Sequence, residues 1–228
     1  MMISVNGKVV MITGALGGLG QTVTEKFSQA GAKVVVVDRE LPEKLPEGLL
    51  GISADVTDEA DVRRLMKEAV QKTTRIDCLI NLVGGFAMGR LSETEVSVWS
   101  RMVSLNLTSA FLLSREATRL MSKQGSGRII HMAAQAAVNP FPGAGAYIVS
   151  KSGLLALIRV LALELAGSRV KVNGVLPSTI DTPANRQSMP DADPSEWVKP
   201  EAIAALLVFL ASDEADALNG ALIPIGSS

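Results

Sequence analysis

Short apolar runs alternate with amphipathic segments along the whole chain. Seven of the runs have the length and the β-branched content of buried strands: 9–12, 33–37, 50–54, 78–83, 128–132, 170–176 and 221–225. Segments between them repeat apolar positions at helical spacing: 21–30, 58–74, 92–121, 147–165 and 200–211. Strands and helices that alternate without a linker predict one α/β domain over residues 1–228, a Rossmann-type doubly wound parallel sheet of about seven strands.

Two stretches between these elements carry signals of their own. Ser92 to Glu95 has the sequence of a capping box, so we expect a helix to begin there and to continue toward Met121, as two helices or one bent helix. Residues 178–199 contain several prolines and no convincing period. A loop of that length in a compact domain is usually functional, and we expect it to lie over the ligand pocket as a substrate loop, with or without a short helix.

Composition and charge exclude several classes of protein. The chain has 22 basic and 23 acidic residues, a net charge of -1 and no block of like charge, so it lacks the electrostatic footprint of a nucleic-acid or membrane-surface protein. One cysteine excludes an internal disulfide, and one histidine leaves no credible metal set. No leader segment or uninterrupted apolar stretch of membrane-spanning length is evident. We therefore expect a cytoplasmic protein that acts on a small molecule.

A glycine-rich turn follows the first predicted strand. Gly14, Gly18 and Gly20 have the spacing Gly-x-x-x-Gly-x-Gly, which lets the backbone approach a pyrophosphate and directs a helix amino terminus at it. Asp38 ends the second strand, where a carboxylate accepts hydrogen bonds from ribose hydroxyls and repels a 2′-phosphate. These signals together predict NAD(H), although an arginine such as Arg39 can sometimes tolerate the phosphate.

Tyr147 and Lys151 place a phenol and an ammonium four residues apart, on one face of a predicted helix. A cation one turn away is expected to lower the pKa of the phenol toward the range useful for acid-base catalysis. An ordinary amphipathic pair has the same spacing, so the catalytic interpretation depends on context. Ligands of doubly wound sheets bind at the carboxyl ends of the strands. The residues predicted at those ends are Gly14, Asp38, Asn81, Ala134 and Pro177.

Over essentially its whole length the sequence resembles the short-chain dehydrogenase/reductase family. The matching segments are Thr13 to Gly20, Asp38, Asp55-Val56, Asn81 to Gly84, Asn106, Tyr147-x-x-x-Lys151 and Pro177 to Thr182. The resemblance implies that Tyr147 gives or takes the proton, and that Lys151 holds the ribose and lowers the tyrosine pKa. It implies that Asn106 positions the lysine through a water. It further implies that the cofactor is met by Gly14, Leu16, Gly18, Leu19, Gly20, Asp38, Asp55, Val56, Asn81, Gly84, Lys151, Pro177, Ile180 and Thr182.

One position departs from the family pattern. The serine that orients the substrate lies thirteen residues before the tyrosine in the family, and that residue is Ala134 here. Either Gln135 or a water replaces the hydroxyl, or the substrate does not need one, or the protein is no longer catalytic.

A narrower resemblance concerns the loop Asp181 to Trp197, which is similar to the corresponding loop of dihydropteridine reductases. Gly84-Gly85-Phe86-Ala87 is similar to their Gly-Gly-Trp-Ala, and those enzymes also carry alanine at the serine position. They reduce quinonoid dihydropterin with NADH. Asn106 is instead typical of ordinary dehydrogenases, and a structural lid shared by descent would explain the loop equally well.

Three functional hypotheses follow. The favoured one is an NADH-dependent oxidoreductase acting on a flat conjugated ring, with Phe86, Met88 and Trp197 as candidate walls that core packing explains nearly as well. The second is an alcohol or ketone dehydrogenase, and the third is a regulator that binds NAD(H) without turnover. Leu157, Val160 and Leu163 leave a second apolar face on the helix after Tyr147, which predicts a homodimer or homotetramer.

Overall fold

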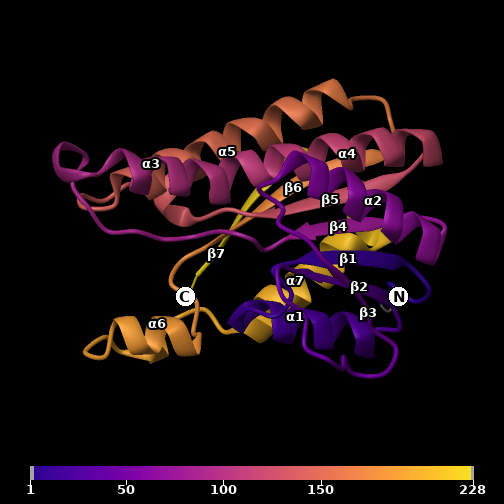
Figure 1. The fold of residues 1–228 in the computed structure, drawn as a ribbon, viewed down its shortest axis with the longest axis horizontal. Helices are drawn as coiled ribbons and strands as arrows, with labels where there is room; N and C mark the ends of the chain where they lie inside the picture. The colour runs from indigo at the N-terminus through magenta and orange to yellow at the C-terminus, as the bar shows by residue number, and fades with distance from the viewer. Residues whose placement is uncertain (1–2, 227–228) are drawn as a thin grey trace.

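The computed structural model describes residues 3–226, and these residues form a seven-stranded parallel sheet (Figure 1). The strands are β1 (Val9–Thr13), β2 (Lys33–Asp38), β3 (Leu50–Ser53), β4 (Cys78–Asn81), β5 (Gly127–Met132), β6 (Val170–Pro177) and β7 (Leu222–Ile225). Their order is β3-β2-β1-β4-β5-β6-β7. β2 and β3 therefore follow on one side of β1, and β4 to β7 follow on its other side. The predicted fold class is confirmed.

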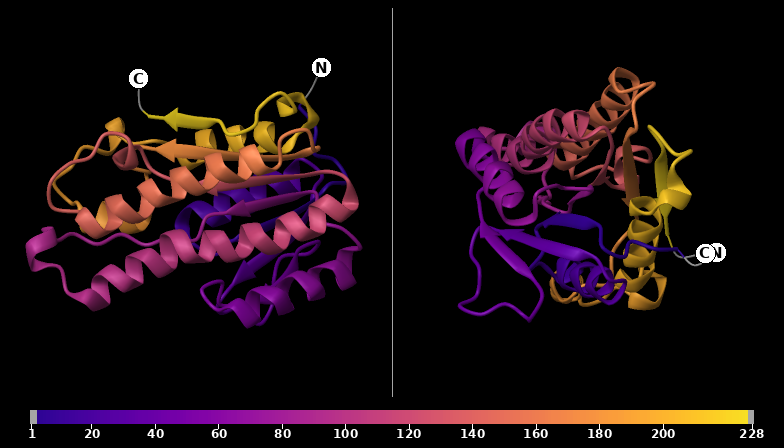
Figure 2. Two further views of the ribbon diagram at one scale, coloured as in Figure 1. Left: turned by 90° about the horizontal axis from the view of Figure 1, so that it is seen from above. Right: turned by 90° about the vertical axis from the view of Figure 1, so that its right-hand side faces the viewer.

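Helices cover both faces of the sheet (Figures 1 and 2). One face carries α1 (Gly18–Gln29) and α7 (Pro200–Ala211), and the other carries α2 (Glu59–Thr73), α4 (Ser109–Gln124) and α5 (Gly145–Glu164). Phe27 and Leu207 belong to the apolar layer on the first face, and Leu113 and Ile158 to the layer on the second. Because the central strands are covered on both sides, β1, β4 and β5 are buried at every position, as continuous apolar runs in parallel sheets require.

The order reversal between β1 and β4 positions the candidate site. Helices leave these two strands toward opposite faces, which opens a crevice outside their carboxyl ends. The glycine turn after β1 and the segment 82–85 after β4 therefore lie on either side of the same crevice.

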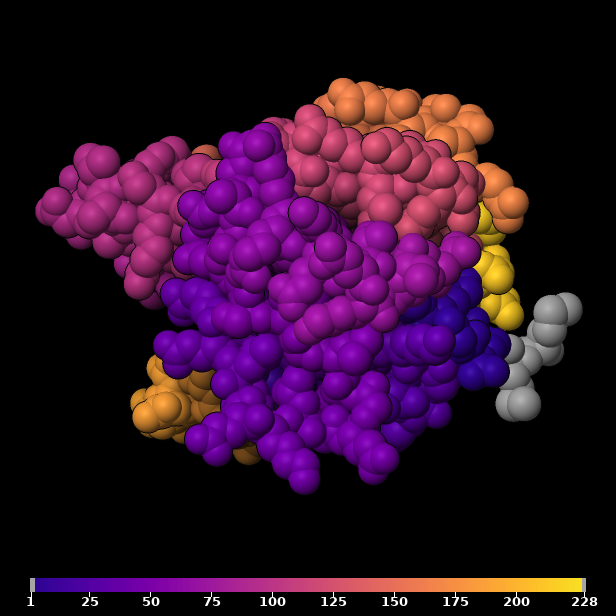
Figure 3. All heavy atoms as spheres, turned by 45° about the vertical axis from the view of Figure 1, so that its right-hand side comes forward, coloured from indigo at the N-terminus to yellow at the C-terminus, as the bar shows by residue number. Residues whose placement is uncertain are grey.

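The segment after the crevice forms one interrupted helix. It consists of α3 (Val96–Val103), a π-helical turn at Ser104–Thr108 and then α4, so the expectation of two helices or one bent helix over this segment is confirmed. A π turn accommodates one extra residue and is common at functional sites. Figure 1 shows that α3 extends beyond the end of the sheet, and Figure 3 shows the same segment projecting from the body of the molecule.

The predicted capping box at Ser92 to Glu95 is wrong. Leu91–Glu93 forms a separate 3₁₀ turn, and α3 begins at Val96 with no side-chain bond from its N-cap residue Glu95. The Thr94 hydroxyl donates to the carbonyl of Arg90, 2.8 Å away. This local side-chain bond competes with the helical one and delays the helix start.

The helix α5 has two apolar faces, as predicted, although Leu157 is partly buried and packs against the core cluster instead of lying with Val160 and Leu163 on the exposed face. Leu154 and Ile158 are buried against the sheet, while Val160 and Leu163 are 50% and 75% exposed. Of the helices in residues 3–226, α5 alone has the length and average hydropathy of a membrane span. Lys151 and Arg159 interrupt its apolar sequence, and the packing of Leu154 and Ile158 is that of a core helix in a folded domain.

Candidate active site

The glycine turn after β1 is held in a shape that only glycine permits at two positions. Gly14 has a φ of 71°, in the left-handed region. A Cβ atom on Gly20 would lie 2.2 Å from the Gly14 carbonyl oxygen, so the first turn of α1 packs directly on the end of β1. The N-cap residue Gly17 offers no side-chain acceptor, which leaves the first amides of α1 for an anionic ligand.

Asp38 joins the glycine turn to the end of β2. Its carboxylate accepts hydrogen bonds from the amides of Leu16, at 3.1 Å, and Arg39, at 2.9 Å. It also lines a cavity of about 260 Å³ at the carboxyl ends of β1, β2 and β4. Other predicted cofactor residues that line this cavity are Gly14, Asp55, Val56 and Gly84.

Asp55 shapes the wall of this cavity through its neighbours. One carboxylate oxygen accepts from both the amide and the hydroxyl of Thr57, at 2.9 and 2.6 Å. This local turn fixes the backbone at Val56, whose side chain is buried. Thr57 also lines the cavity, and the sequence analysis did not identify it.

Asn81 is buried and does not line the cavity. Its side-chain oxygen accepts from the Thr13 hydroxyl, at 2.8 Å, and from the Val83 amide, at 3.1 Å. Its side-chain nitrogen lies 3.3 Å from Nδ1 of His131, and Nε2 of His131 lies 2.8 Å from the Ser114 hydroxyl. The Asn81 side chain therefore joins β1, β4 and β5 and holds the turn that leads to Gly84.

Lys151 is almost completely buried beneath the end of β5. Its ammonium donates to the carbonyl of Met132, 2.8 Å away. Burial lowers the pKa of Lys151 to about 8, because the low-dielectric interior disfavours the charged amine. The Lys151 ammonium thus lies inside the protein, at the end of β5.

Tyr147 lies one helical turn before Lys151 and is only partly buried. Its ring meets Phe86 edge to face, with the ring centroids 4.9 Å apart. Burial raises the pKa of Tyr147 to about 12. The expected lowering of the tyrosine pKa by Lys151 is therefore wrong for the protein alone, because burial disfavours the charged phenolate.

Asn106 lies in the π turn and is anchored on both sides. Its oxygen accepts from the Gly85 amide at 2.9 Å, and its nitrogen donates to the Gly85 carbonyl and to the Ser150 hydroxyl, each at 3.0 Å. The Ser150 hydroxyl in turn donates to the Tyr147 carbonyl at 2.7 Å. Sequence analysis missed Ser150, although a serine on the sheet-facing side of an apolar helix is a signal that could have identified it.

The groups of Asn106 and Lys151 converge on one glycine. A Cβ atom on Gly84 would come 2.8 Å from the Asn106 oxygen and 3.2 Å from the Lys151 ammonium. Gly84 thereby allows both polar groups to lie at the crevice wall. The structure thus brings together the four predicted positions Gly84, Asn106, Tyr147 and Lys151.

The position of the absent serine is apolar and closely packed. Ala134 is buried, and the side-chain nitrogen Nε2 of Gln135 donates to the Ile225 carbonyl at 3.1 Å. That bond holds the Gln135 side chain on β7 and uses one of the two N–H donors of its carboxamide. The second donor leaves open whether Gln135 replaces the serine.

The three predicted walls of a substrate ring differ in exposure. Phe86 and Met88 are 55% and 65% exposed, and Met88 lies beside Gly143 in the loop that leads to Tyr147. Trp197 is only 7% exposed. Phe86 and Met88 therefore present side-chain surface to solvent, whereas Trp197 is largely covered by the protein, and the wall role of all three residues stays a prediction.

The segment 178–199 folds back over the glycine turn. It contains the short helix α6 (Pro183–Ser188) and a 3₁₀ turn at Pro194–Glu196, and Ile180 forms a bridge with Val198. Thr182 caps α6 by accepting from the Asn185 amide at 3.3 Å, and its side chain lies against Gly18. Leu19 is in the first turn of α1, and Pro177 ends β6. These positions place Ile180 and Thr182 near the glycine turn.

Among residues 3–226 no group of three histidine, cysteine or carboxylate side chains is arranged to hold a metal ion.

The sheet topology and the glycine turn define a dinucleotide-binding α/β protein of the Rossmann type. The chain belongs to the short-chain dehydrogenase family, because residues 8–193 match the family model described as short chain dehydrogenase. Members of this family are NAD(P)(H)-dependent oxidoreductases.

Relatives match the chain over nearly its whole length. It is 32% identical to a 3-oxoacyl-(acyl-carrier-protein) reductase of Thermotoga maritima, with 96% of each chain covered. It is also 32% identical to a meso-2,3-butanediol dehydrogenase of Serratia marcescens, with 96% of this chain and 93% of the relative covered.

Solved structures agree with this relationship. A short-chain type dehydrogenase/reductase from Mycobacterium ulcerans superimposes with a TM-score of 0.91 at 26% identity, covering 97% of this chain and 89% of the other. A 3-ketoacyl-(acyl-carrier-protein) reductase from Brucella melitensis, solved with NADH, has a TM-score of 0.88 at 27% identity and 99% coverage of both chains.

Proposed function

We propose that the protein is an NADH-dependent short-chain oxidoreductase in which Tyr147 exchanges a proton with a small conjugated substrate. The observation that carries the proposal is the approach of the Asn106 and Lys151 side chains to Gly84 at the crevice, with Tyr147 one helical turn before Lys151 and its ring against Phe86. A bound nicotinamide dinucleotide would supply or accept the hydride. The protein supplies the binding site, the orientation and the proton.

The described residues fit such a cofactor. The free amides of α1 suit a pyrophosphate, and the Asp38 carboxylate at the cavity suits ribose hydroxyls. Asp55 and Val56 form the wall on the adenosine side. On this proposal Pro177, Ile180 and Thr182 bound the nicotinamide end, and residues 178–199 act as the substrate loop.

Lys151 would hold its proton more firmly once its ammonium faces ribose hydroxyls as well as the Met132 carbonyl. Its charge then stabilises the phenolate of Tyr147 and brings the phenol closer to the range in which it can transfer a proton. Asn106 and Ser150 act as positioning residues, because their hydrogen bonds connect the turn at Gly85 to the Tyr147 backbone.

The preference for NADH rests on Asp38. A 2′-phosphate at its carboxylate would place two anions together in a partly buried site. We expect NADH to bind more tightly than NADPH. Asp38→Asn should reduce the ratio of the NADPH to the NADH dissociation constant by about tenfold, the scale of one charge-assisted interaction. Fluorescence titration of both cofactors measures this ratio, and tighter NADPH binding by the wild type would contradict the assignment.

A flat conjugated ring such as quinonoid dihydropterin is the proposed substrate class. Ala134 provides no hydroxyl to orient a ketone, and the exposed rim of Phe86 and Met88 offers apolar contact next to Tyr147. The similarity of Asp181 to Trp197 to dihydropteridine reductases supports the same class. Its imine needs a hydride and a proton but no serine-held carbonyl.

The alternative is a carbonyl reductase or alcohol dehydrogenase in which Gln135 or a water replaces the serine. The relatives support it, since one is a 3-oxoacyl reductase and another a butanediol dehydrogenase. The second alternative is a regulator that binds NAD(H) without turnover.

A substrate panel separates these functions. NADH oxidation is measured with quinonoid dihydropterin and with a series of ketones, for the wild type and for Ala134→Ser. The favoured function predicts turnover of the pterin by the wild type, and a gain for ketones only in Ala134→Ser. Turnover of ketones alone would favour the carbonyl reductase, and tight NADH binding without any turnover would favour the regulator.

We also propose that the protein is cytoplasmic and forms a homodimer or homotetramer through the exposed face of α5. The exposed apolar side chains of Val160 and Leu163 support the second part.

A further inference from the structure

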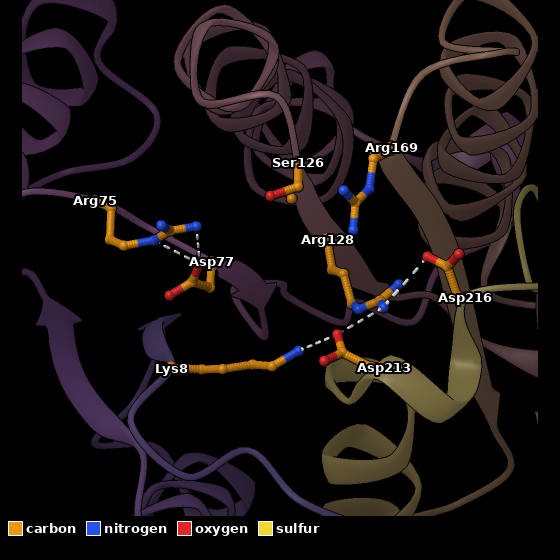
Figure 4. A pocket seen from close by; sticks show the side chains of 9 residues that line it. Lys8, Arg75, Asp77, Ser126, Arg128, Arg169, Asp213 and Asp216 are labelled. Atoms are coloured by element: carbon orange, nitrogen blue, oxygen red, sulfur yellow. Dashed lines mark hydrogen bonds and ion pairs between the residues drawn. The ribbon is translucent and has the colours of Figure 1, made fainter.

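A second cavity, of about 480 Å³, lies at the amino ends of the strands, opposite the crevice at their carboxyl ends (Figure 4). It is lined by residues at or just before the amino ends of β1, β4, β5 and β6 and by the 3₁₀ turn at Asp213–Ala215 after α7. The lining contains four basic side chains and three carboxylates. Its size is in the range of small-molecule sites, and its charged walls suit a charged ligand rather than an apolar one.

Two of the basic groups are already neutralised. Arg75 pairs with Asp77 at 2.6 Å, and Lys8 pairs with Asp213 at 2.6 Å. Asp77 also accepts the amide of Val9, at 2.9 Å, so this carboxylate is committed to the protein. These pairs form part of the wall. The remaining positive charge of the lining is on Arg128 and Arg169.

Arg128 is a charged group that the protein satisfies poorly. Its side chain is only 9% exposed, yet its contacts with Asp213 and Asp216 are long, at 3.4 and 3.5 Å, and both involve the same terminal nitrogen. Both carboxylates are largely exposed, so they provide weak compensation. A buried guanidinium with five donors gains most from an acceptor that meets several of them at once.

Arg169 provides a second guanidinium for the same space. Figure 4 shows its side chain pointing toward Arg128 from the residue before β6. Within residues 3–226 the Arg169 side chain has no hydrogen-bond or ion-pair partner. The hydroxyl of Ser126 likewise bonds to none of the described residues and faces the cavity. Two guanidinium groups that approach each other repel unless an anion lies between them.

We propose that this cavity binds a small phosphate-bearing molecule, with the phosphate held by Arg128, Arg169 and Ser126. A tetrahedral dianion can accept from both guanidinium forks and from a hydroxyl together. The site lies at the amino ends of the strands, whereas the proposed catalytic crevice lies at their carboxyl ends, so the two sites are separate. It does not depend on the proposed substrate.

Pyrophosphate is the probe for the test, because it is small and carries the proposed group. Calorimetric titration is done in saturating NADH, so that the dinucleotide site is already filled, and at an ionic strength matched with sodium chloride. We expect binding by the wild type, and a dissociation constant raised by about tenfold or more in Arg169→Gln, as loss of a charge-assisted bond implies. Arg101→Gln, which removes an exposed arginine on α3, is the matched control and should bind as the wild type does.

Several outcomes would overturn the proposal. These are heat that disappears once NADH is saturating, equal affinity in Arg169→Gln and the wild type, or malonate binding as tightly as pyrophosphate, which would assign the cavity to dicarboxylates. NADH affinity reports whether each variant is folded. If Arg169→Gln fails this check, Ser126→Ala tests the same cavity, and an unchanged pyrophosphate affinity in that variant would contradict the assignment.

Discussion

His131, the single histidine, lies at the centre of the sheet rather than in either cavity. The Asn81 oxygen already accepts from Thr13 and Val83, so the Asn81 nitrogen faces His131 and donates to Nδ1. The proton of the neutral ring is then on Nε2 and is donated to Ser114. Burial, with a smaller contribution from Lys151, lowers the pKa of His131 to about 3.

This pKa predicts a loss of stability in mild acid. Between pH 6.5 and 3 the unfolded chain binds a proton at this residue that the folded chain does not bind. The free energy of unfolding therefore falls as the pH drops below 6.5, with a slope approaching about 1.4 kcal/mol per pH unit. Urea unfolding at pH 7.0, 6.0 and 5.0 measures it, and a folded His131→Gln variant should show a flatter profile. Equal profiles for the two proteins would contradict the buried neutral ring.

At this scale the sequence predicts residue types but not their surroundings. Tyr147, Lys151, Asp38 and Gly20 could be identified because their chemistry needs those side chains at those spacings. The raised pKa of Tyr147 could not be predicted, since it depends on how much protein covers the ring. The bond from Gln135 to Ile225 likewise joins residues 90 positions apart and leaves no local pattern.

The π turn at Ser104–Thr108 is the element that connects the helices to the crevice. It places Asn106 so that one carboxamide bonds to both backbone groups of Gly85 and to Ser150. A regular helix through these residues would rotate Asn106 away from that position, because each residue turns the helix by about 100°. The turn therefore connects the segment after β4 to α5.

Asn106→Ala should weaken both stability and turnover. It leaves the Gly85 amide and carbonyl and the Ser150 hydroxyl without their partner, so we expect the free energy of unfolding to fall by about 2–4 kcal/mol. Turnover should fall as well, because the Tyr147 backbone loses its link to Gly85. Ser104→Ala in the same turn is the control and should change stability by less than about 0.5 kcal/mol. Chemical denaturation that finds both variants equally stable would refute the anchoring role.

The order of the elements was predictable, and most boundaries agree within one or two residues. Apolar runs between amphipathic segments are a direct consequence of a parallel sheet covered on both sides. The start of α3 was mispredicted because the hydroxyl of Thr94 bonds backward to Arg90. A capping sequence does not determine which of two competing bonds forms.

At the scale of the whole molecule, α5 presents exposed apolar side chains on its outer face. Val149, Val160 and Leu163 are exposed on this helix, and Phe111 is exposed on α4. These residues lie on the helical layer that covers β5 and β6 (Figure 2). Apolar groups collected on one layer indicate contact with another protein surface, and a second copy of the chain is the proposed partner.

Leu163→Glu with Val160→Glu should therefore give a monomer. Burying two carboxylates in an apolar interface without partners is strongly unfavourable. Light scattering at micromolar concentration should give a mass near 24.0 kDa for the variant and a multiple of it for the wild type. Gln29→Glu on the opposite helical layer should keep the wild-type mass. A wild type that is already a monomer would contradict the predicted assembly.

The central claim is that Tyr147 transfers the proton beside a bound dinucleotide, and one comparison tests it most directly. Tyr147→Phe removes the hydroxyl but keeps the ring that meets Phe86. The account predicts that turnover with NADH falls by about 10²- to 10⁴-fold, the usual effect of a general acid-base group, while the NADH dissociation constant changes little. Unchanged turnover in Tyr147→Phe, with NADH still bound, would contradict it.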